Sequence, residues 1–68
     1  MDAEPRIRLD QFLKLMGWVR SGGEAKYLIQ SGQVLINGNV DTHRSRKLAE
    51  GDRVSLAGQD ATVNLGGR

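Results

Sequence analysis

The sequence contains no cysteine, a single histidine and only three aromatic residues. The absence of cysteine excludes a disulfide framework, a thiolate metal site and a cysteine nucleophile, and it suits the reducing cytoplasm. One imidazole, His43, cannot complete a zinc site alone. The carboxylates are scattered singly, and the glycines match neither a P-loop nor a dinucleotide fingerprint. We therefore expect no catalytic residue, no metal and no other cofactor.

Long apolar runs are also absent. No segment approaches the roughly 18 apolar residues that span a bilayer, and the first fifteen residues carry charges of both signs instead of an apolar signal core. A chain of 68 residues provides enough surface burial for one small domain. We expect a cytoplasmic monomer without membrane contact, in which residues 1–68 form a single domain with frayed ends.

Positive charge is concentrated in the middle of the chain. The formal net charge is +2, but residues 6–53 contain nine Lys/Arg against five Asp/Glu, an excess of +4. The densest cluster is Arg44, Arg46 and Lys47 beside His43. These three cations repel one another unless an anion lies nearby. The cluster is consistent with nucleic-acid binding, and composition alone fits a hydrated loop equally well.

Two helices are predicted in the first half. Leu9, Phe12, Leu13 and Met16 follow the spacing of one apolar helical stripe, and Gly17 is suited to ending that helix. This pattern predicts a first helix from about residue 9 to residue 16.

The second helix is predicted to begin at a capping box. In Ser21-Gly22-Gly23-Glu24, the Ser hydroxyl accepts from the Glu24 amide while the Glu24 side chain reaches back to the Ser21 amide. The apolar stripe that follows consists of Ala25, Leu28 and Ile29, and Gly32 ends the helix.

After Gly32 the pattern changes to that of strands. Val34-Leu35-Ile36 is followed by Asn37-Gly38, the dipeptide best suited to a type I′ hairpin, and 40–42 is the predicted return strand. Alternation over 53–56 and 61–65 predicts a second hairpin. The predicted fold class is α+β, with two short N-terminal helices packed on a small antiparallel sheet.

The polar side of the second helix combines several groups that can bind RNA. Lys26 and Gln30 lie there with Tyr27, and Arg20 precedes the backbone amides of Gly22 and Gly23, which a phosphate can approach. We interpret Tyr27 as a partly buried ring over a neighbouring loop in preference to a ring that stacks on a base. Phe12 and Trp18 are expected in or near the core.

Together these motifs resemble a known RNA-binding domain. The resemblance rests on Arg8-Leu9-Asp10-Gln11-Phe12-Leu13-Lys14, Gly17, Ser21-Gly22-Gly23-Glu24-Ala25-Lys26, Leu28-Ile29, Gly32-Gln33-Val34, Ile36-Asn37-Gly38, Arg46-Lys47-Leu48 and Gly51-Asp52. This pattern is similar to the domain first described in ribosomal small-subunit protein S-four, also called the αL motif. It covers about residues 7–58, and the chain resembles the stand-alone bacterial members of that family.

The resemblance implies non-catalytic binding of structured RNA, ribosomal or transfer RNA, possible contact with the ribosome, and a basic face formed by the first helix, the start of the second and the 42–47 loop. Many relatives place a second basic residue directly after the capping Ser, where this chain has Gly22. That departure shifts the expected phosphate contacts to other cations. The candidate RNA-binding residues are Arg8, Lys14, Arg20, Lys26, Arg44, Arg46 and Lys47.

Two other functions remain open. The same fold can serve as a protein-interaction module. The ending Leu65-Gly66-Gly67-Arg68 resembles the diglycine tail of ubiquitin-like sulfur carriers, although those proteins begin with a hairpin and Arg68 follows the diglycine here.

Overall fold

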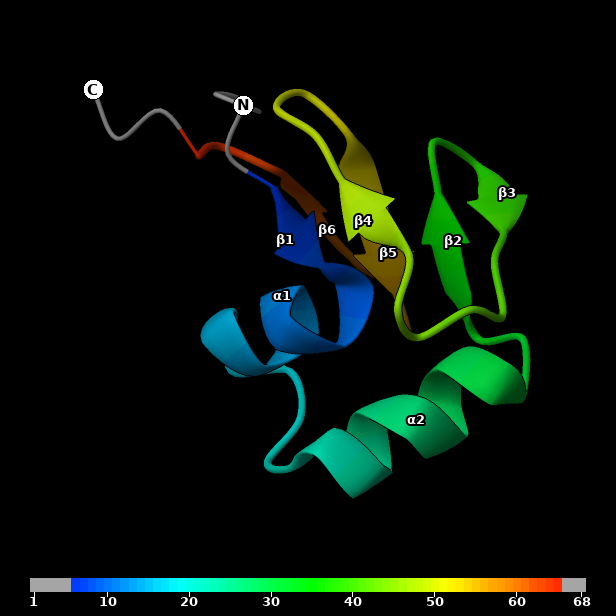
Figure 1. The fold of residues 1–68 in the computed structure, drawn as a ribbon. Coiled ribbons are helices and arrows are strands. Elements are labelled where there is room, and N and C mark those ends of the chain that lie inside the picture. Colours follow the sequence, from blue (N-terminus) through cyan, green and yellow to red (C-terminus); the bar gives the residue numbers. More distant parts are fainter. Residues whose placement is uncertain (1–5, 66–68) are drawn as a thin grey trace.

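The helices and strands follow the predicted α+β order in a computed structural model that describes residues 6–65. Residues 1–5 and the predicted diglycine tail Gly66-Gly67-Arg68 lie outside the described residues. The elements are β1 (Ile7–Arg8), α1 (Leu9–Leu15), α2 (Gly22–Gln30), β2 (Val34–Ile36), β3 (Asn39–Val40), β4 (Lys47–Leu48), β5 (Arg53–Leu56) and β6 (Gln59–Thr62) (Figure 1).

Both helices end at the predicted glycines. Gly17 and Gly32 adopt φ angles of +75° and +82°, the left-handed conformation that a helix stop requires. At the start of α2, the Ser21 hydroxyl accepts from the Glu24 amide at 3.1 Å, as predicted. The Glu24 carboxylate accepts from the Arg20 amide at 2.8 Å, one residue before the predicted partner. This contact fixes the chain as it enters α2.

Four strands form one antiparallel sheet in the order β3-β2-β5-β6. Asn37 and Gly38 both have positive φ angles, 53° and 87°, which confirms the predicted turn. The return strand is shorter than predicted, because the chain turns at Asp41, whose carboxylate accepts from the His43 amide. The second hairpin turns at Ala57-Gly58, and β6 covers Gln59–Thr62 instead of 61–65.

A second, two-stranded ladder was not predicted. β1 pairs antiparallel with β4, with Ile7 opposite Leu48 and Arg8 opposite Lys47. Two-residue strands are too short to show an alternating pattern in the sequence. This ladder connects the start of α1 to the end of the 42–46 loop, so it matters for the functional site.

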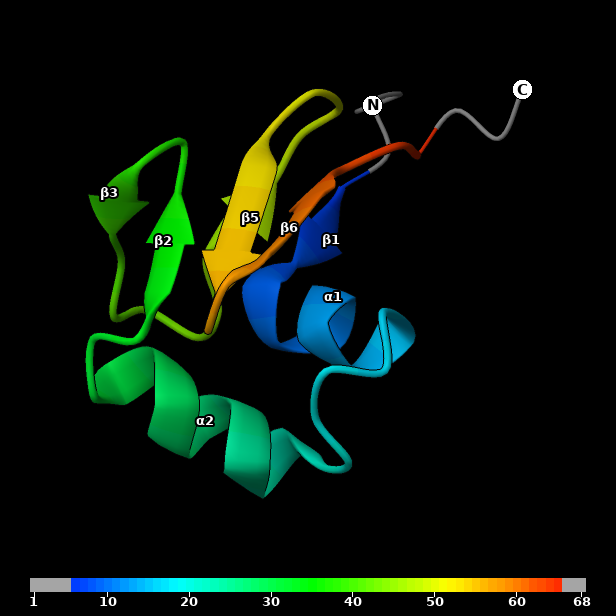
Figure 2. The ribbon, with the colours of Figure 1, turned by 180° about the vertical axis from the view of Figure 1, so that it is seen from behind.

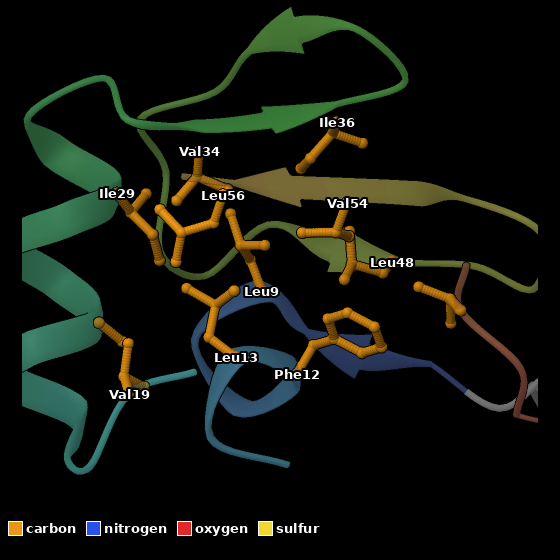
Figure 3. Packing of buried hydrophobic residues seen from close by; sticks show 12 residues of the cluster. Leu9, Phe12, Leu13, Val19, Ile29, Val34, Ile36, Leu48, Val54 and Leu56 are labelled. Atoms are coloured by element: carbon orange, nitrogen blue, oxygen red, sulfur yellow. The ribbon is translucent and has the colours of Figure 1, made fainter. Parts of the chain in front are cut away.

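The core lies between the helices, the β1/β4 ladder and one face of the four-stranded sheet (Figure 3). Phe12 is buried, and Trp18 is half-buried and meets its ring edge-on at a centroid distance of 6.3 Å. Met16, predicted as part of the stripe, is 41% exposed because it follows the last turn of α1. The buried hydrophobic residues are Leu9, Phe12, Leu13, Val19, Ala25, Ile29, Val34, Ile36, Leu48, Val54, Leu56 and Val63.

The opposite face of the sheet is open. Seen from behind, β5 and β6 lie in front of the ladder, and no helix covers them (Figure 2). The molecule therefore has two different surfaces. One surrounds the start of α1, and the other is the open face of the four-stranded sheet.

Candidate nucleic-acid interface

The start of α1 is organised around one buried carboxylate. Asp10 is 7% exposed and is the one buried polar or charged residue within 6–65. Arg8 donates to it from Nε at 3.2 Å and from Nη2 at 2.9 Å, and Arg44 Nε lies 3.6 Å from its Oδ2. The Gln11 amide donates to Oδ1 at 2.9 Å. Asp10 therefore brings together two arginines that are 36 positions apart, and we call Arg8, Asp10 and Arg44 the Asp10 cluster.

The 42–46 loop is joined to the same helix start through its backbone. The Leu9 amide donates to the Arg46 carbonyl at 2.8 Å, and the Asp10 amide donates to the Arg44 carbonyl at 3.2 Å. Amides in the first turn of a helix have no partner within the helix. The loop carbonyls supply those partners, and the loop consequently lies beside the start of α1 (Figure 1).

A second carboxylate organises the rest of the loop. Asp41 accepts from the His43 amide at 2.9 Å and from Arg46 Nη1, and its Oδ1 lies 3.0 Å from His43 Nδ1. Partial burial acts to raise the pKa of Asp41, but the hydrogen bonds from His43 and Arg46 outweigh it and hold that pKa below its ordinary value. Asp41 is therefore ionised at neutral pH. We call Asp41, His43 and Arg46 the Asp41 cluster.

These two clusters correct two expectations from the sequence. The loop arginines have anions nearby within the protein itself, and Asp10 and Asp41 are not merely scattered, solvated carboxylates. The side chains of Arg8, Arg44 and Arg46 nevertheless stay 41%, 42% and 41% exposed. Because a guanidinium has five N–H donors, each of the three retains donors for a second anion such as a phosphate.

Lys47 lies next to these arginines, although the sequence placed it in a loop. It belongs to β4, where it stands opposite Arg8 in the ladder, and it is exposed. The structure thus brings together four of the seven predicted cations around the start of α1: Arg8, Arg44, Arg46 and Lys47.

The side chains of the other three predicted cations are not joined to this group by a hydrogen bond or an ion pair in the described part of the chain. Lys14 is exposed in the last turn of α1, Arg20 precedes α2, and Lys26 is exposed on α2. These three residues, like Lys47, form no ion pair within residues 6–65. Their ammonium and guanidinium groups are therefore not held in place by a carboxylate of residues 6–65.

Tyr27 is more exposed than predicted. Its residue is 67% accessible on the outer side of α2, so the interpretation as a partly buried ring over a loop is wrong. The reason is that α2 packs on the core through Ala25 and Ile29, which lie on the side of the helix opposite Tyr27. The ring and its hydroxyl are both available to a partner.

Sequence reasoning missed the two organising carboxylates. Asp41 had a recognisable signal, because an Asp side chain often accepts from the amide two residues later, as it does here with His43. Asp10 had no comparable signal for Arg44. An acid in the first turn of a helix already suits the positive end of the helix dipole, so its position alone points to no distant partner.

The open sheet face carries a hollow of about 590 Å³ that does not share this excess of positive charge. Its lining is largely polar, and its charged residues are one cation, Arg53, and one anion, Asp60. Within residues 6–65, no group of three or more His, Asp or Glu side chains is placed to hold a metal ion. In the same range, none of the helices has the length and apolar character needed to cross a membrane.

Comparison with known proteins shows the family to which the chain belongs. The family model of the S4 domain matches residues 3–64. YbcJ of Escherichia coli (strain K12) is 42% identical over 59 residues, which cover 87% of this chain and 84% of YbcJ. A Bacillus subtilis (strain 168) protein named "Probable ribosome maturation protein RlbA" is 46% identical over 52 residues, 76% of this chain and 73% of that protein.

The fold is also similar to a solved structure. The solution structure of Escherichia coli YbcJ, described as revealing an αL motif involved in RNA-binding, has a TM-score of 0.69 and 38% identity, and it covers 96% of this chain and 82% of YbcJ. The predicted α+β fold with an αL motif is thereby confirmed. Because both the family model and these relatives cover most of the chain, the protein belongs to the S4 domain family of RNA-binding domains.

Proposed function

We propose that this protein binds structured RNA without catalysis, through the surface around the start of α1. The observation that carries the proposal is the convergence of α1, the 42–46 loop and β4, which places four cations together. Structured RNA offers closely spaced phosphates and 2′-hydroxyls, which are recognised largely by shape and charge. The proposed RNA-binding residues are Arg8, Lys14, Arg20, Lys26, Arg44, Arg46 and Lys47.

The partner we propose is ribosomal RNA, with transfer RNA as the second choice, and the place of action is the bacterial cytoplasm. Support comes from the relatives, since YbcJ is described with an RNA-binding motif and the name of RlbA refers to ribosome maturation. The protein acts as a monomer in this proposal, because a single copy already presents the grouped cations.

A salt titration tests the proposal. Binding of a fluorescently labelled ribosomal RNA hairpin is measured by anisotropy at several salt concentrations. If four or five cations each neutralise a phosphate, the slope of log K against log salt is roughly −3 to −4.5. Absence of binding at low salt, or binding that does not vary with salt, contradicts the proposal. A labelled transfer RNA in the same assay ranks the two RNA classes.

A matched pair of variants tests the location of the surface. Replacing Arg44, Arg46 and Lys47 with Ala is expected to weaken RNA binding strongly while the far-ultraviolet circular dichroism stays native. Arg53→Ala is the control, because Arg53 is an exposed cation on the open sheet face. If the triple variant binds like the wild type, or Arg53→Ala causes the larger loss, the proposed surface is wrong.

A protein-interaction module is the second candidate, favoured by the exposed neighbours Leu15 and Met16 at the end of α1, 70% and 41% accessible. A pull-down from lysate with and without nuclease separates the two functions. Partners that disappear with nuclease support RNA binding, and partners that persist support a protein partner. The sulfur-carrier alternative requires processing after Gly67, so an intact mass that retains Arg68 in cells contradicts it.

A further inference from the structure

Asp10 presents an electrostatic paradox at the proposed RNA-binding surface. A buried carboxylate lies between two cations that we expect to meet phosphates. If charge alone mattered, Asp10 would weaken RNA binding, because it cancels one of the two positive charges and repels a phosphate. Its contacts indicate a different role.

We propose that Asp10 is a positioning residue for RNA binding, which holds Arg8 and Arg44 as one two-armed phosphate clamp. This inference rests on the proposed function. Arg8 donates to Asp10 through both Nε and Nη2, so its guanidinium plane has a fixed orientation. Arg44 approaches the same Oδ2 through Nε. Without the carboxylate, the two guanidinium groups repel each other and move apart.

The remaining donors of the clamp suit a single phosphate. The Asp10 cluster has a formal charge of +1, and its two exposed arginines retain N–H groups that do not contact Asp10. A phosphodiester carries one negative charge and accepts several hydrogen bonds, so it neutralises the cluster and can accept from both arginines. Arginine side chains that are already held in place lose less conformational freedom when RNA binds than unpaired side chains do.

The test uses the fact that the two roles predict opposite changes in RNA affinity. Loss of a positioning residue lowers the affinity, whereas loss of a negative charge raises it. In Asp10→Asn, the amide nitrogen of Asn faces the Arg8 donors and cannot accept from them. The Arg8 and Arg44 side chains therefore lose the carboxylate that holds them, although the net charge rises by one. We expect RNA affinity to fall roughly three- to tenfold, the range of coupling between neighbouring groups. Asp60→Asn makes the same charge change on the open sheet face, where Asp60 contacts Ser55. Its expected change is less than about twofold, in the direction of tighter binding.

A second pair of changes covers the case in which Asp10→Asn does not fold. The variant with Arg8→Lys and Arg44→Lys keeps every charge, and both positions are about two-fifths exposed, so it preserves the fold. It replaces the fixed forks with single ammonium groups and is expected to lose affinity to a similar extent. Where Asp10→Asn folds, adding it to this background is expected to cause no further loss, because the clamp is already absent.

The outcomes separate this inference from the proposed function. If wild-type protein binds RNA with the expected salt slope but Asp10→Asn binds as tightly as Asp60→Asn, the positioning role is wrong and the function stands. Full affinity in the double lysine variant also overturns the role. If the wild type does not bind RNA at low salt, the proposed function itself fails.

Discussion

The seven proposed RNA-binding cations fall into two groups that differ in how they are held. Arg8, Arg44 and Arg46 each contact a carboxylate of Asp10 or Asp41, whereas Lys14, Arg20, Lys26 and Lys47 form no ion pair within residues 6–65. The first group has fixed geometry and reduced net charge. The second has full charge and free side chains. On this comparison, we expect the held arginines to fix the position of a bound RNA backbone and the free cations mainly to add attraction to it.

The residue types agree with this division. All three held cations are arginines, whose planar fork can contact a carboxylate with some donors and a phosphate with others. Three of the four free cations are lysines, which act as flexible point charges. A flexible charge attracts a phosphate from many directions and therefore specifies its position only loosely.

The largest expected effect comes from removing two charges from each group in turn. Arg44→Ala with Arg46→Ala is expected to weaken RNA binding by about a hundredfold near 0.1 M salt, and Lys14→Ala with Lys26→Ala by about tenfold. The arginine pair loses more because its removal also leaves Asp10 and Asp41 with fewer cations, so that they repel phosphates. Anisotropy titrations measure both variants under identical conditions.

Both double variants are expected to reduce the salt slope by a similar amount, because each loses two cations. If the lysine variant loses as much RNA affinity as the arginine variant, the proposed difference between held and free cations is wrong. Native circular dichroism for both is the control for folding.

A smaller effect is expected at the entrance to α2, beside the free cation Arg20. Ser21→Ala removes the hydroxyl that accepts from the Glu24 amide and is expected to lower the free energy of unfolding by about 1 kcal/mol. RNA affinity is expected to change less than about threefold, because Arg20 makes no ion pair that the cap could disturb. Urea unfolding and anisotropy are measured in parallel.

Ser31→Ala is the matched control at the other end of the same helix, where the Ser31 hydroxyl donates to the Leu28 carbonyl. Its effect on stability is expected to be smaller. A large loss of RNA affinity in Ser21→Ala would show that Arg20 is positioned as strictly as the held arginines.

Asp41 and Asp52 are two carboxylates with lowered pKa values, one at the proposed interface and one outside it. A bond from the Ala49 amide, and a further one from Asn37, outweigh partial burial and hold the pKa of Asp52 below its ordinary value, and the pKa of Asp41 is lowered as well. Both carboxylates therefore stabilise the folded state above their ordinary pKa near 4, and this contribution is lost as pH falls through their lower folded values.

Urea unfolding between about pH 3 and pH 6 measures this loss. Asp52→Asn and Asp41→Asn are both expected to flatten the pH dependence of stability, but only Asp41→Asn is expected to weaken RNA binding at neutral pH, because it releases Arg46. Equal RNA affinity in the two variants would contradict a special role for the held arginines.

Local signals in the sequence account for most of the fold. Gly17, Ser21, Gly32 and Asn37-Gly38 determine helix ends and a turn through contacts within a few residues, and all were predicted. The β1/β4 ladder was not, since two-residue strands carry no periodicity and their pairing depends on the rest of the fold.

The candidate site was predictable as a set of cations but not as an arrangement. Each cation is visible in the sequence, whereas the contact between Arg44 and Asp10 joins residues 34 positions apart. Composition therefore suggested mutual repulsion in the loop, and only the three-dimensional structure shows which carboxylates relieve it. All seven cations stay predictions as RNA-binding residues, and the structure adds only how three of them are held.

The smallest expected effect lies outside both groups of cations, in the turn between β5 and β6. Ala57 has a φ of +52° before Gly58, nearly the geometry that Asn37 adopts before Gly38. Because Asn tolerates this conformation better than Ala, Ala57→Asn is expected to raise the free energy of unfolding by about 0.5–1 kcal/mol, measured by urea unfolding. RNA affinity is expected to stay unchanged, since stability and cation geometry are separate properties. A loss of affinity would extend the RNA-binding surface to this turn and weaken the distinction between held and free cations.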